Sequence, residues 1–385
     1  MCSDTFVELF GCSSLQTLDV SEVHNPFVAN AIDSVAQVLL IEGSLPTLSY
    51  LKIWHWKTDN FDTINSMSSL RKLEIQTPAE DLSMIIWQHR YLKELTLNTL
   101  FLKTFPLLAE LSLLTDLRLE NNKISDLRPI NQLINLETLV IQRCISFDFS
   151  PLQSLFRLNY LQIDEAPNLT DVEFLTKLTQ LSLLILCETT VQNITPLSSC
   201  TNLCSLLISK CPISDISALV TLKNLKSIRL TKTNVSDLSP IGDLSLLEEL
   251  NVSYSMISNL NPIATCTRLK TLEARNCRLT NEGVSELVHL TDLEEIIVDN
   301  NSTLSDLSFL RCNTTLTTLG ISETAVEDVT ILARISTLRV FYCSRYVKTL
   351  EPLRGIPLKR LTCRKHLLIV DYEKHWKNCF WTFQW

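Results

Sequence analysis

The sequence is poor in glycine and contains no long apolar run. Only 6 of its 385 residues are glycine, which leaves almost no material for phosphate-binding loops or for a series of tight hairpins. No stretch approaches the ~18 apolar residues of a membrane-spanning helix. The first residues lack the basic and apolar segments of a secretory signal. We therefore expect no membrane span and a cytoplasmic or nuclear location.

Motifs for catalysis and for metal binding are also absent. The sequence has no P-loop, no G-x-S-x-G and no G-x-G-x-x-G, and its six histidines show no paired metal spacing. The thirteen cysteines include no C-x-x-C pair, so we expect them to be structural. The net charge of −8 opposes nucleic-acid binding, which needs a basic face. We expect no catalytic residues, no cofactor, no metal and no nucleic-acid partner.

Leucine, by contrast, is abundant and periodic. The chain has 71 leucines, and many of them belong to the pattern L-x-x-L-x-[L/I/V]. The first leucines of these patterns are Leu48, Leu70, Leu92, Leu114, Leu136, Leu158, Leu181, Leu203, Leu225, Leu247, Leu269, Leu293, Leu316, Leu338 and Leu358. Their spacing is 22 or 23 residues, except for 24 after Leu269 and 20 after Leu338. A fixed period of this length indicates a solenoid of stacked repeats.

Other positions of the repeat agree with this interpretation. An I-S-D-L-like step, often followed by proline, comes ten to thirteen residues after the first leucine, and its acids Asp126, Asp215 and Asp237 are expected to form turns rather than a catalytic pair. A small polar residue is expected eight residues after that leucine, where it can bond to exposed backbone inside the turn. This column contains Asn122, Cys144, Thr189, Cys211, Thr233, Ser255, Cys277, Asn301 and Thr324.

These repeats resemble those of the leucine-rich-repeat superfamily, in its short 22-residue class. Similar repeats occur in bacterial internalins, in the regulatory subunit of protein phosphatase 1 and in trypanosomatid leucine-rich-repeat proteins. The resemblance covers roughly residues 45–363. It implies an α/β solenoid, a right-handed superhelix of about sixteen coils with parallel strands on the concave face and mostly 3-10 or irregular segments on the convex side. It implies little about function, because such proteins bind many unrelated partners.

The ends of the chain depart from the repeat, so we predict three regions. Residues 1–47 form irregular N-terminal coils or an incomplete cap, which leaves open that the chain is a fragment. Residues 48–363 form the solenoid, in which residues 280–290 resemble a longer helical back segment. Residues 364–385 form an aromatic tail with three of the six tryptophans, interpreted as an apolar plug, a docking peptide or an aberrant end of the reading frame.

A partner-binding surface is predicted on the strand face, at its central repeats. Five apolar residues are expected to be exposed there on four neighbouring strands, namely Val140, Tyr160, Leu183, Ile185 and Leu207. Four cations are expected to rim them, namely Arg143, Lys210, Arg229 and Lys232. Apolar patches with a charged rim often mark interaction sites. A second candidate is an acidic cluster of Glu248, Glu249, Glu273, Glu294, Glu295 and Asp299, although a solvated acidic face is the simpler interpretation.

The predicted function is that of a monomeric, non-enzymatic scaffold or adaptor that binds a protein partner. Two alternatives remain open at this stage. One is a regulatory subunit of a phosphatase or ubiquitin ligase, which would bind its enzyme through the same face. The other is a fragment of a surface adhesin, which would need an export signal and an anchor outside this sequence.

Overall fold

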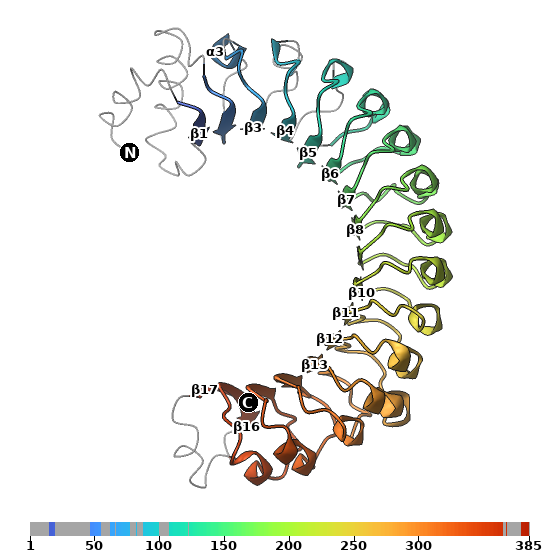
Figure 1. Cartoon of the computed structure of the whole chain (residues 1–385), viewed down its shortest axis with the longest axis vertical. Coiled ribbons are helices and arrows are strands. Elements are labelled where there is room, and N and C mark those ends of the chain that lie inside the picture. The colour runs from blue at the N-terminus through green and yellow to red at the C-terminus, as the bar shows by residue number, and fades with distance from the viewer. Residues whose placement is uncertain are drawn as a thin grey trace, which may run out of the picture. The chain divides into compact units, whose positions relative to one another are not determined.

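The fold consists of short parallel strands that alternate with short 3-10 helices (Figure 1). The computed structural model describes residues 15–19, 47–54, 62–65, 67–77, 82, 88–99, 108–121, 123–364, 367 and 379–384. Among these residues, no helix has the length and apolar character needed to cross a bilayer. The contacts divide the chain into a first unit, residues 1–181 with 188–190, and a second unit, residues 182–187 with 191–385.

The first unit contains the early strands, which pair in parallel in chain order. They are β1 (Thr17–Asp19), β2 (Tyr50–Ile53), β3 (Lys72–Gln76), β4 (Glu94–Asn98), β5 (Asp116–Glu120), β6 (Thr138–Gln142) and β7 (Tyr160–Asp164). Behind them lie α3 (Asp62–Asn65), η1 (Leu108–Glu110), η2 (Arg128–Gln132), η3 (Ser150–Ser154) and η4 (Glu173–Lys177). Most of the region 1–47, predicted to be irregular, lies outside the described residues; within it, β1 pairs with β2.

The second unit repeats the same arrangement. Its strands are β8 (Leu183–Cys187), β9 (Ser205–Ser209), β10 (Ser227–Thr231), β11 (Glu249–Asn251), β12 (Thr271–Glu273), β13 (Glu295–Ile297), β14 (Thr318–Gly320), β15 (Val340–Tyr342), β16 (Arg360–Arg364) and β17 (Phe380–Gln384). Its 3-10 helices are η5 (Thr195–Ser199), η6 (Ser217–Thr221), η7 (Ser239–Ile241), η8 (Asn261–Thr265), η9 (Glu282–His289), η10 (Ser308–Leu310), η11 (Thr330–Arg334) and η12 (Glu351–Leu353). In each unit taken by itself, the strands line the inner side of its curve (Figure 1).

The strand register follows the predicted period. Lys72 of β3 lies beside Glu94 of β4, 22 residues later, and the longer step appears where Thr271 pairs with Glu295. The same repeat contains η9, an eight-residue 3-10 helix at the segment predicted to be a longer helical back segment. The tail was expected to depart from the repeat, yet β17 extends the sheet in register with β16. Trp376 of that tail lies outside the described residues.

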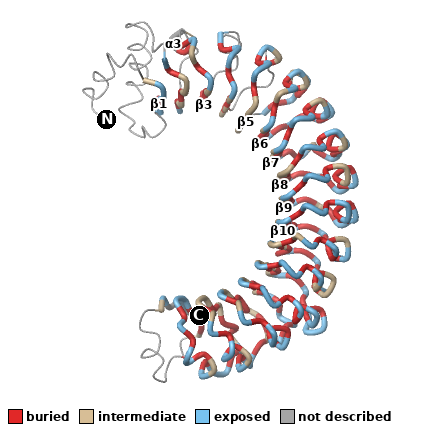
Figure 2. Tube along the Cα trace, viewed as in Figure 1, coloured by how far each residue is buried: buried red, intermediate tan, exposed pale blue. Residues whose placement is uncertain are grey.

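The core runs through the inside of every coil. In the repeat that starts at Leu114, the inward side chains of Leu117, Leu119, Ile124 and Leu133 are all 0 % exposed. Burying each such side chain contributes about 1.5–3 kcal/mol. Figure 2 shows buried positions inside the coils and exposed positions on their outer surfaces. A single repeat has no second layer of its own, so its apolar side chains are buried only by stacking on neighbouring repeats.

Side chains in the predicted polar column bond to backbone, as expected. The hydroxyls of Ser255 and Thr324 donate to carbonyls three residues earlier, at 2.6 Å and 2.7 Å. The Asn301 amide donates to the carbonyls of Ala274 and Val298, both at 2.8 Å. Buried Cys144 and Cys277 donate weakly to carbonyls, each at 3.3 Å. Side chains of this column thus bond to backbone carbonyls inside the coil. Asn122 lies outside the described residues.

Candidate functional site

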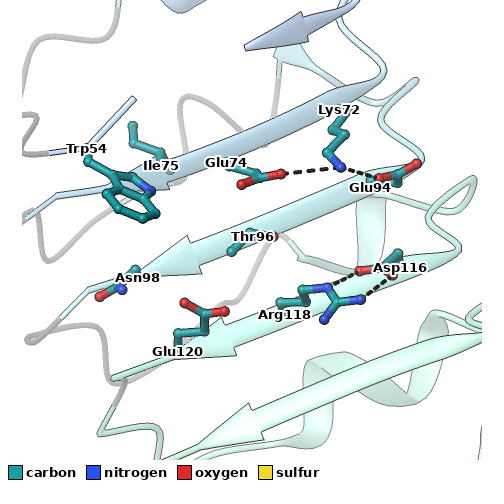
Figure 3. Close-up of a pocket in the computed structure, with 10 residues that line it drawn as sticks. All are labelled: Trp54, Lys72, Glu74, Ile75, Glu94, Thr96, Asn98, Asp116, Arg118 and Glu120. Carbon is teal, nitrogen blue, oxygen red and sulfur yellow. Dashed lines mark hydrogen bonds and ion pairs between the residues drawn. The ribbon is translucent and has the colours of Figure 1, made fainter. Parts of the chain in front are cut away.

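The strand face of the first unit carries a pocket above β3, β4 and β5 (Figure 3). Along these strands every second side chain points outward, and the register places outward residues of neighbouring strands side by side. The middle strand contributes Glu94 at its start and the shorter Thr96 and Asn98 after it. Glu74 flanks Thr96 on one side, and Arg118 flanks it on the other. The pocket above these three strands has a volume of about 330 Å³.

Ion pairs order one end of this pocket. Lys72 Nζ lies 3.2 Å from Glu74 Oε1 and 2.9 Å from Glu94 Oε2. Arg118 donates two hydrogen bonds of 3.1 Å to the carboxylate of Asp116. Burial alone would lower the pKa of the Lys72 ammonium, but its hydrogen bonds to Glu94 and Glu74 outweigh burial and raise that pKa. Both cations therefore stay charged and fixed at neutral pH.

An indole ring closes the other end of the pocket. Trp54, just after β2, is 38 % exposed, and the Lys52 ammonium lies 4.6 Å from its ring centroid. Lys52 also lies 3.7 Å from Asp19 Oδ2 and 3.9 Å from Glu74 Oε2. In Figure 3 the ring of Trp54 and the carboxylate of Glu120 lie toward the end opposite Lys72. The pocket thus combines an aromatic wall with charged groups of both signs.

In the second unit, three of the predicted apolar residues lie together. Leu183 and Ile185 of β8 and Leu207 of β9 are half-exposed on the strand face. Ile185 lies in register beside Leu207, and Leu207 in register beside Arg229 of β10. This row, which we call the Ile185 row, comprises Ile185, Leu207 and Arg229. The structure therefore places two aliphatic side chains next to a guanidinium.

In the first unit, the expectation of an exposed Val140 is wrong. Val140 is only 3 % exposed, although it lies on the outward side of β6. Its register neighbours are the long side chains Arg118 and Gln162, and a short valine between two long side chains loses contact with water. Tyr160 is half-exposed, and its hydroxyl donates to Gln162 Oε1 at 2.6 Å. Burial is the main reason that the pKa of Tyr160 is raised.

The four predicted rim cations are exposed. Arg143 Nε lies 3.1 Å from Glu165 Oε2 within the first unit. In the second unit, Arg229 lies 3.8 Å from Glu249 Oε2, and the Lys232 ammonium lies 5.6 Å from the ring centroid of Tyr254. The backbone N–H of Lys210 donates to Thr231 O at 3.0 Å. Such exposed pairs contribute little to stability, so the cations remain available for exchange with a ligand.

The predicted acidic cluster of the second unit is partly neutralised by its own strand face. Arg275 contacts the carboxylates of Glu273 and Asp299, and Lys270 Nζ lies 3.3 Å from Glu294 Oε1. Asp299 also accepts the backbone N–H of Ser322 at 2.7 Å. Burial, followed by the charge of Glu273, raises the pKa of Glu295. Across the described residues, no group of three His, Cys, Asp or Glu side chains is arranged to hold a metal ion.

Comparisons with known proteins identify the fold. No protein-family model and no curated protein matches this sequence. Among solved structures, a leucine-rich-repeat protein from Leptospira interrogans has a TM-score of 0.80 at 19 % identity, covering 98 % of both chains. An internalin (InlF) from Listeria monocytogenes has a TM-score of 0.71 at 22 % identity, covering 94 % of this chain and 95 % of its own. The chain has the leucine-rich-repeat fold.

A third match among solved structures is a protein in complex with RNA. The TLR13 protein, in its complex with ssRNA13, has a TM-score of 0.67 at 18 % identity, and the match covers 90 % of this chain and 57 % of that one. All three likenesses concern the fold. The pocket and the Ile185 row are described from this chain's own residues.

All the described cysteines are free thiols. Burial raises the pKa of Cys144 to about 11 and that of Cys200 to about 12, so neither is a thiolate at neutral pH. The pocket itself was missed by the sequence reasoning, which looked for apolar residues on the strand face. A detectable signal was the short pair Thr96 and Asn98 between repeats with longer side chains at the same positions.

Proposed function

We propose that this protein is a non-enzymatic interaction scaffold that binds another protein through its strand face, as a monomer in the cytoplasm or nucleus. The observation that carries the proposal is the Ile185 row, in which half-exposed Ile185 and Leu207 adjoin Arg229. Apolar side chains with a charged rim are typical of interaction sites. Solenoids commonly bind their partners on the strand side.

We propose contact residues in each unit separately. In the second unit they are the Ile185 row with Leu183, Lys210 and Lys232. In the first unit they are Tyr160 and Arg143, and Val140 is not among them because its side chain is buried. The aliphatic side chains would be covered by the partner, while the cations would steer an acidic partner toward the site.

A pull-down from source lysate, read by quantitative mass spectrometry, tests this function. The wild-type chain is compared with Leu183→Ser, Ile185→Ser and Leu207→Ser combined. Each truncated anchor costs about 1–2 kcal/mol of binding, so the triple variant should lose a micromolar partner altogether. Circular dichroism verifies that the variant remains folded.

The matched control replaces two exposed apolar residues of the second unit that lie away from the strand face. Val220 of η6 and Met256 are each 45 % exposed, so Val220→Ser with Met256→Ser changes surface apolarity without touching the site. The control should retain the partner. Equal retention by both variants would contradict the site. Binding of a single-stranded RNA oligonucleotide in fluorescence anisotropy, with no protein retained, would contradict the function.

A further inference from the structure

Apolar side chains gather at the edge of the first unit where its strands begin. In each repeat a turn there leads from the convex side into the strand. A hydrogen bond from the backbone N–H of the first leucine to the carbonyl three residues earlier closes this turn, at 3.0 Å for Leu92, Leu114, Leu136 and Leu158. The two residues between these ends form the tip of a β-turn. In these four successive turns one tip residue is large, apolar and exposed, namely Tyr91 (60 %), Leu113 (46 %), Ile134 (47 %) and Phe156 (51 %).

The four turns are stacked on one another, in the order of the strands β4 to β7 that follow them (Figure 1). Just beyond the first two turns, the backbone N–H of Thr115 donates to Lys93 O at 2.8 Å. Asn135 donates to Ser112 O at 2.8 Å and accepts a bond of 3.0 Å from Arg157, so its side chain connects the last three turns. The apolar tip residues therefore form one row along this edge. We call it the turn ridge, and it comprises Tyr91, Leu113, Ile134 and Phe156.

The fold itself does not require apolar residues at these tips. Neighbouring turns of the same kind have polar tips, both before and after the ridge and at the start of the second unit. These polar tip residues are Ser68, Ser69, Thr179, Gln180, Thr201, Asn202, Lys223 and Asn224. Four apolar tips in succession are thus a feature of this stretch alone among the turns compared. Exposed apolar residues that adjoin one another mark interaction sites, whereas scattered ones need no explanation.

Positive charge lies at both ends of the turn ridge. Arg90 is the other tip residue of the first turn, and Arg157 is that of the last turn; both are exposed. The Arg71 guanidinium lies 5.5 Å from the ring centroid of Tyr91, which places a further cation at the first end. Lys93, exposed and just after the first turn, adds to it. A partner that follows the ridge therefore meets arginine where it begins and where it ends.

The carboxylates beside the ridge lie near its middle instead. Glu110 precedes the second turn on the convex side, and Glu137 follows the third turn on the strand side; both are exposed. Neither is a tip residue. The charge along this edge is thus positive at the ends and negative beside the centre, which favours a partner with acidic ends.

The spacing of the ridge matches that of an α-helix. Neighbouring strands lie about 4.8 Å apart, so the three steps from Tyr91 to Phe156 span about 15 Å. An α-helix advances about 5.4 Å per turn, so a helix laid along the ridge brings one apolar side chain to each tip over about three turns. The ridge exposes on the order of a few hundred Å², well below the ~800 Å² that each partner contributes to a stable interface between folded proteins. A single helix therefore fits the ridge better than a second copy of the chain.

We infer that the turn ridge binds an amphipathic α-helix of a partner protein. The apolar stripe of that helix, with residues at i, i+4, i+7 and i+11, packs along the ridge. Acidic residues at its two ends lie beside Arg90 and Arg157. This inference goes beyond the proposed function, because the ridge lies at the edge where the strands of the first unit begin and shares no residue with the strand-face contacts.

Fluorescence anisotropy with the full chain at physiological salt tests this inference. The probe is a labelled, alanine-based helical peptide that has leucine at i, i+4, i+7 and i+11 and glutamate at both ends. A second peptide has the same composition but its leucines are distributed around the helix, and a third has lysine in place of the terminal glutamates. We expect the first peptide to bind at least about tenfold more tightly than the second, because only its leucines meet the ridge together. It should bind about two- to tenfold more tightly than the third, because like charges repel at the ends.

Two variants and a matched control locate the binding. Leu113→Ser with Ile134→Ser removes the centre of the ridge and should weaken binding of the first peptide at least about tenfold. Arg157→Gln should reduce the preference for the glutamate peptide over the lysine peptide about two- to fivefold. The control is Ile145→Ser with Phe147→Ser, which removes two exposed apolar side chains (42 % and 86 % exposed) after β6, at the opposite edge of the same unit. Its affinity should stay within about twofold of the wild type. Thermal melts establish that each variant is folded.

Three results would overturn the inference. They are no binding of the first peptide by the wild type, equal affinity for the peptide with distributed leucines, and equal weakening in the ridge and control variants. Self-association of the wild type in sedimentation velocity, abolished by Leu113→Ser with Ile134→Ser, would also overturn it, by assigning the ridge to a second copy of the chain. A failure here with a pull-down partner still dependent on Ile185 and Leu207 leaves the proposed function standing, because the two surfaces share no residue.

Discussion

Ten of the described residues have positive φ although none of them is glycine. Each lies seven positions after the first leucine of its repeat, as in Arg143 (φ 60°), Lys232 (φ 55°) and Asn276 (φ 49°). This conformation costs a non-glycine residue about 1–2 kcal/mol. The backbone N–H of such residues bonds to a carbonyl of the next repeat, at 3.0 Å for Arg143 and 2.9 Å for Asn276. That hydrogen bond offsets the cost, and it explains how a chain with so little glycine closes its turns.

Gly320 is the position where a single side-chain atom should have a large effect. A Cβ there would lie 2.9 Å from Asp299 Oδ1 and 3.0 Å from Ile297 Cδ1. We expect Gly320→Ala to push Asp299 off the N–H of Ser322 and to lower the free energy of unfolding by about 1–3 kcal/mol. Chemical denaturation measures the change. Gly355→Ala is the control, because nothing lies within 4 Å of its Cβ and stability should change by less than about 0.5 kcal/mol.

At the scale of the element, several 3-10 helices begin with the same kind of turn. In it, a side-chain oxygen accepts the backbone N–H of the residue two positions later. Asp215 Oδ1 accepts the N–H of Ser217 at 2.8 Å, and Asp237 Oδ1 accepts that of Ser239 at 2.9 Å. Asn193 makes the same bond to Thr195 at 2.9 Å. The prediction that these acids form turns is confirmed. The bond from the Ser217 N–H lowers the pKa of Asp215 below 3.8, and Ser239 lowers that of Asp237 in the same way.

These carboxylates make stability depend on acid. Since their pKa values are lower in the folded chain, their stabilisation is present above pH 3.8 and is lost as the pH falls through the folded pKa values. Replacing Asp215, Asp237 and Asp328 together by asparagine keeps the turn, as Asn193 does, and removes the titration. We expect the variant and the wild type to have the same melting temperature at pH 7. When the pH is lowered, the melting temperature of the variant should fall by less than that of the wild type. An unchanged slope in the triple variant would contradict the argument.

The strands and their register were predictable from the sequence because leucine spacing fixes both. The 24-residue step and its longer back segment were visible for the same reason. Strand β17 was not, because Phe380–Gln384 has aromatic residues where the other repeats have leucine. The division into residues 1–47, 48–363 and 364–385 stays a prediction. Backbone pairing in a sheet needs extended residues in register and does not require a leucine signature.

At the scale of the whole molecule, a repeat contacts only its neighbours, so damage should stay local. Leu119 of β5 and Leu230 of β10 are both 0 % exposed, one in each unit. Truncating either to alanine should cost about 2–5 kcal/mol. We expect hydrogen–deuterium exchange to rise in β4, β5 and β6 for Leu119→Ala, and in β9, β10 and β11 for Leu230→Ala. A uniform rise along the chain would instead mean that the molecule opens as one cooperative body.

Function was harder to predict than fold because it depends on differences between repeats. Periodicity reports what the repeats share, such as buried leucines and turn-forming acids. Val140 and Thr96 illustrate what periodicity does not report. Both occupy the same outward position of their strands, and the residues beside them on the neighbouring strands decide what surrounds them. Val140 is only 3 % exposed between Arg118 and Gln162, whereas Thr96 lines the pocket above β3, β4 and β5 between Glu74 and Arg118. Such outcomes depend on how the side chains of adjacent strands are arranged, and a single repeat does not contain that information.

The constant register between strands has a consequence for how such a gene can change. Because Ser205 of β9 pairs with Ser227 of β10 and Ser227 with Glu249 of β11, losing one whole repeat would leave equivalent positions opposite each other. Slippage by exactly one repeat during replication would therefore lengthen or shorten the binding face while sparing the coils on either side. Loss of a single codon inside a strand would turn its leucines outward. Natural variation in this gene should accordingly come in whole repeats.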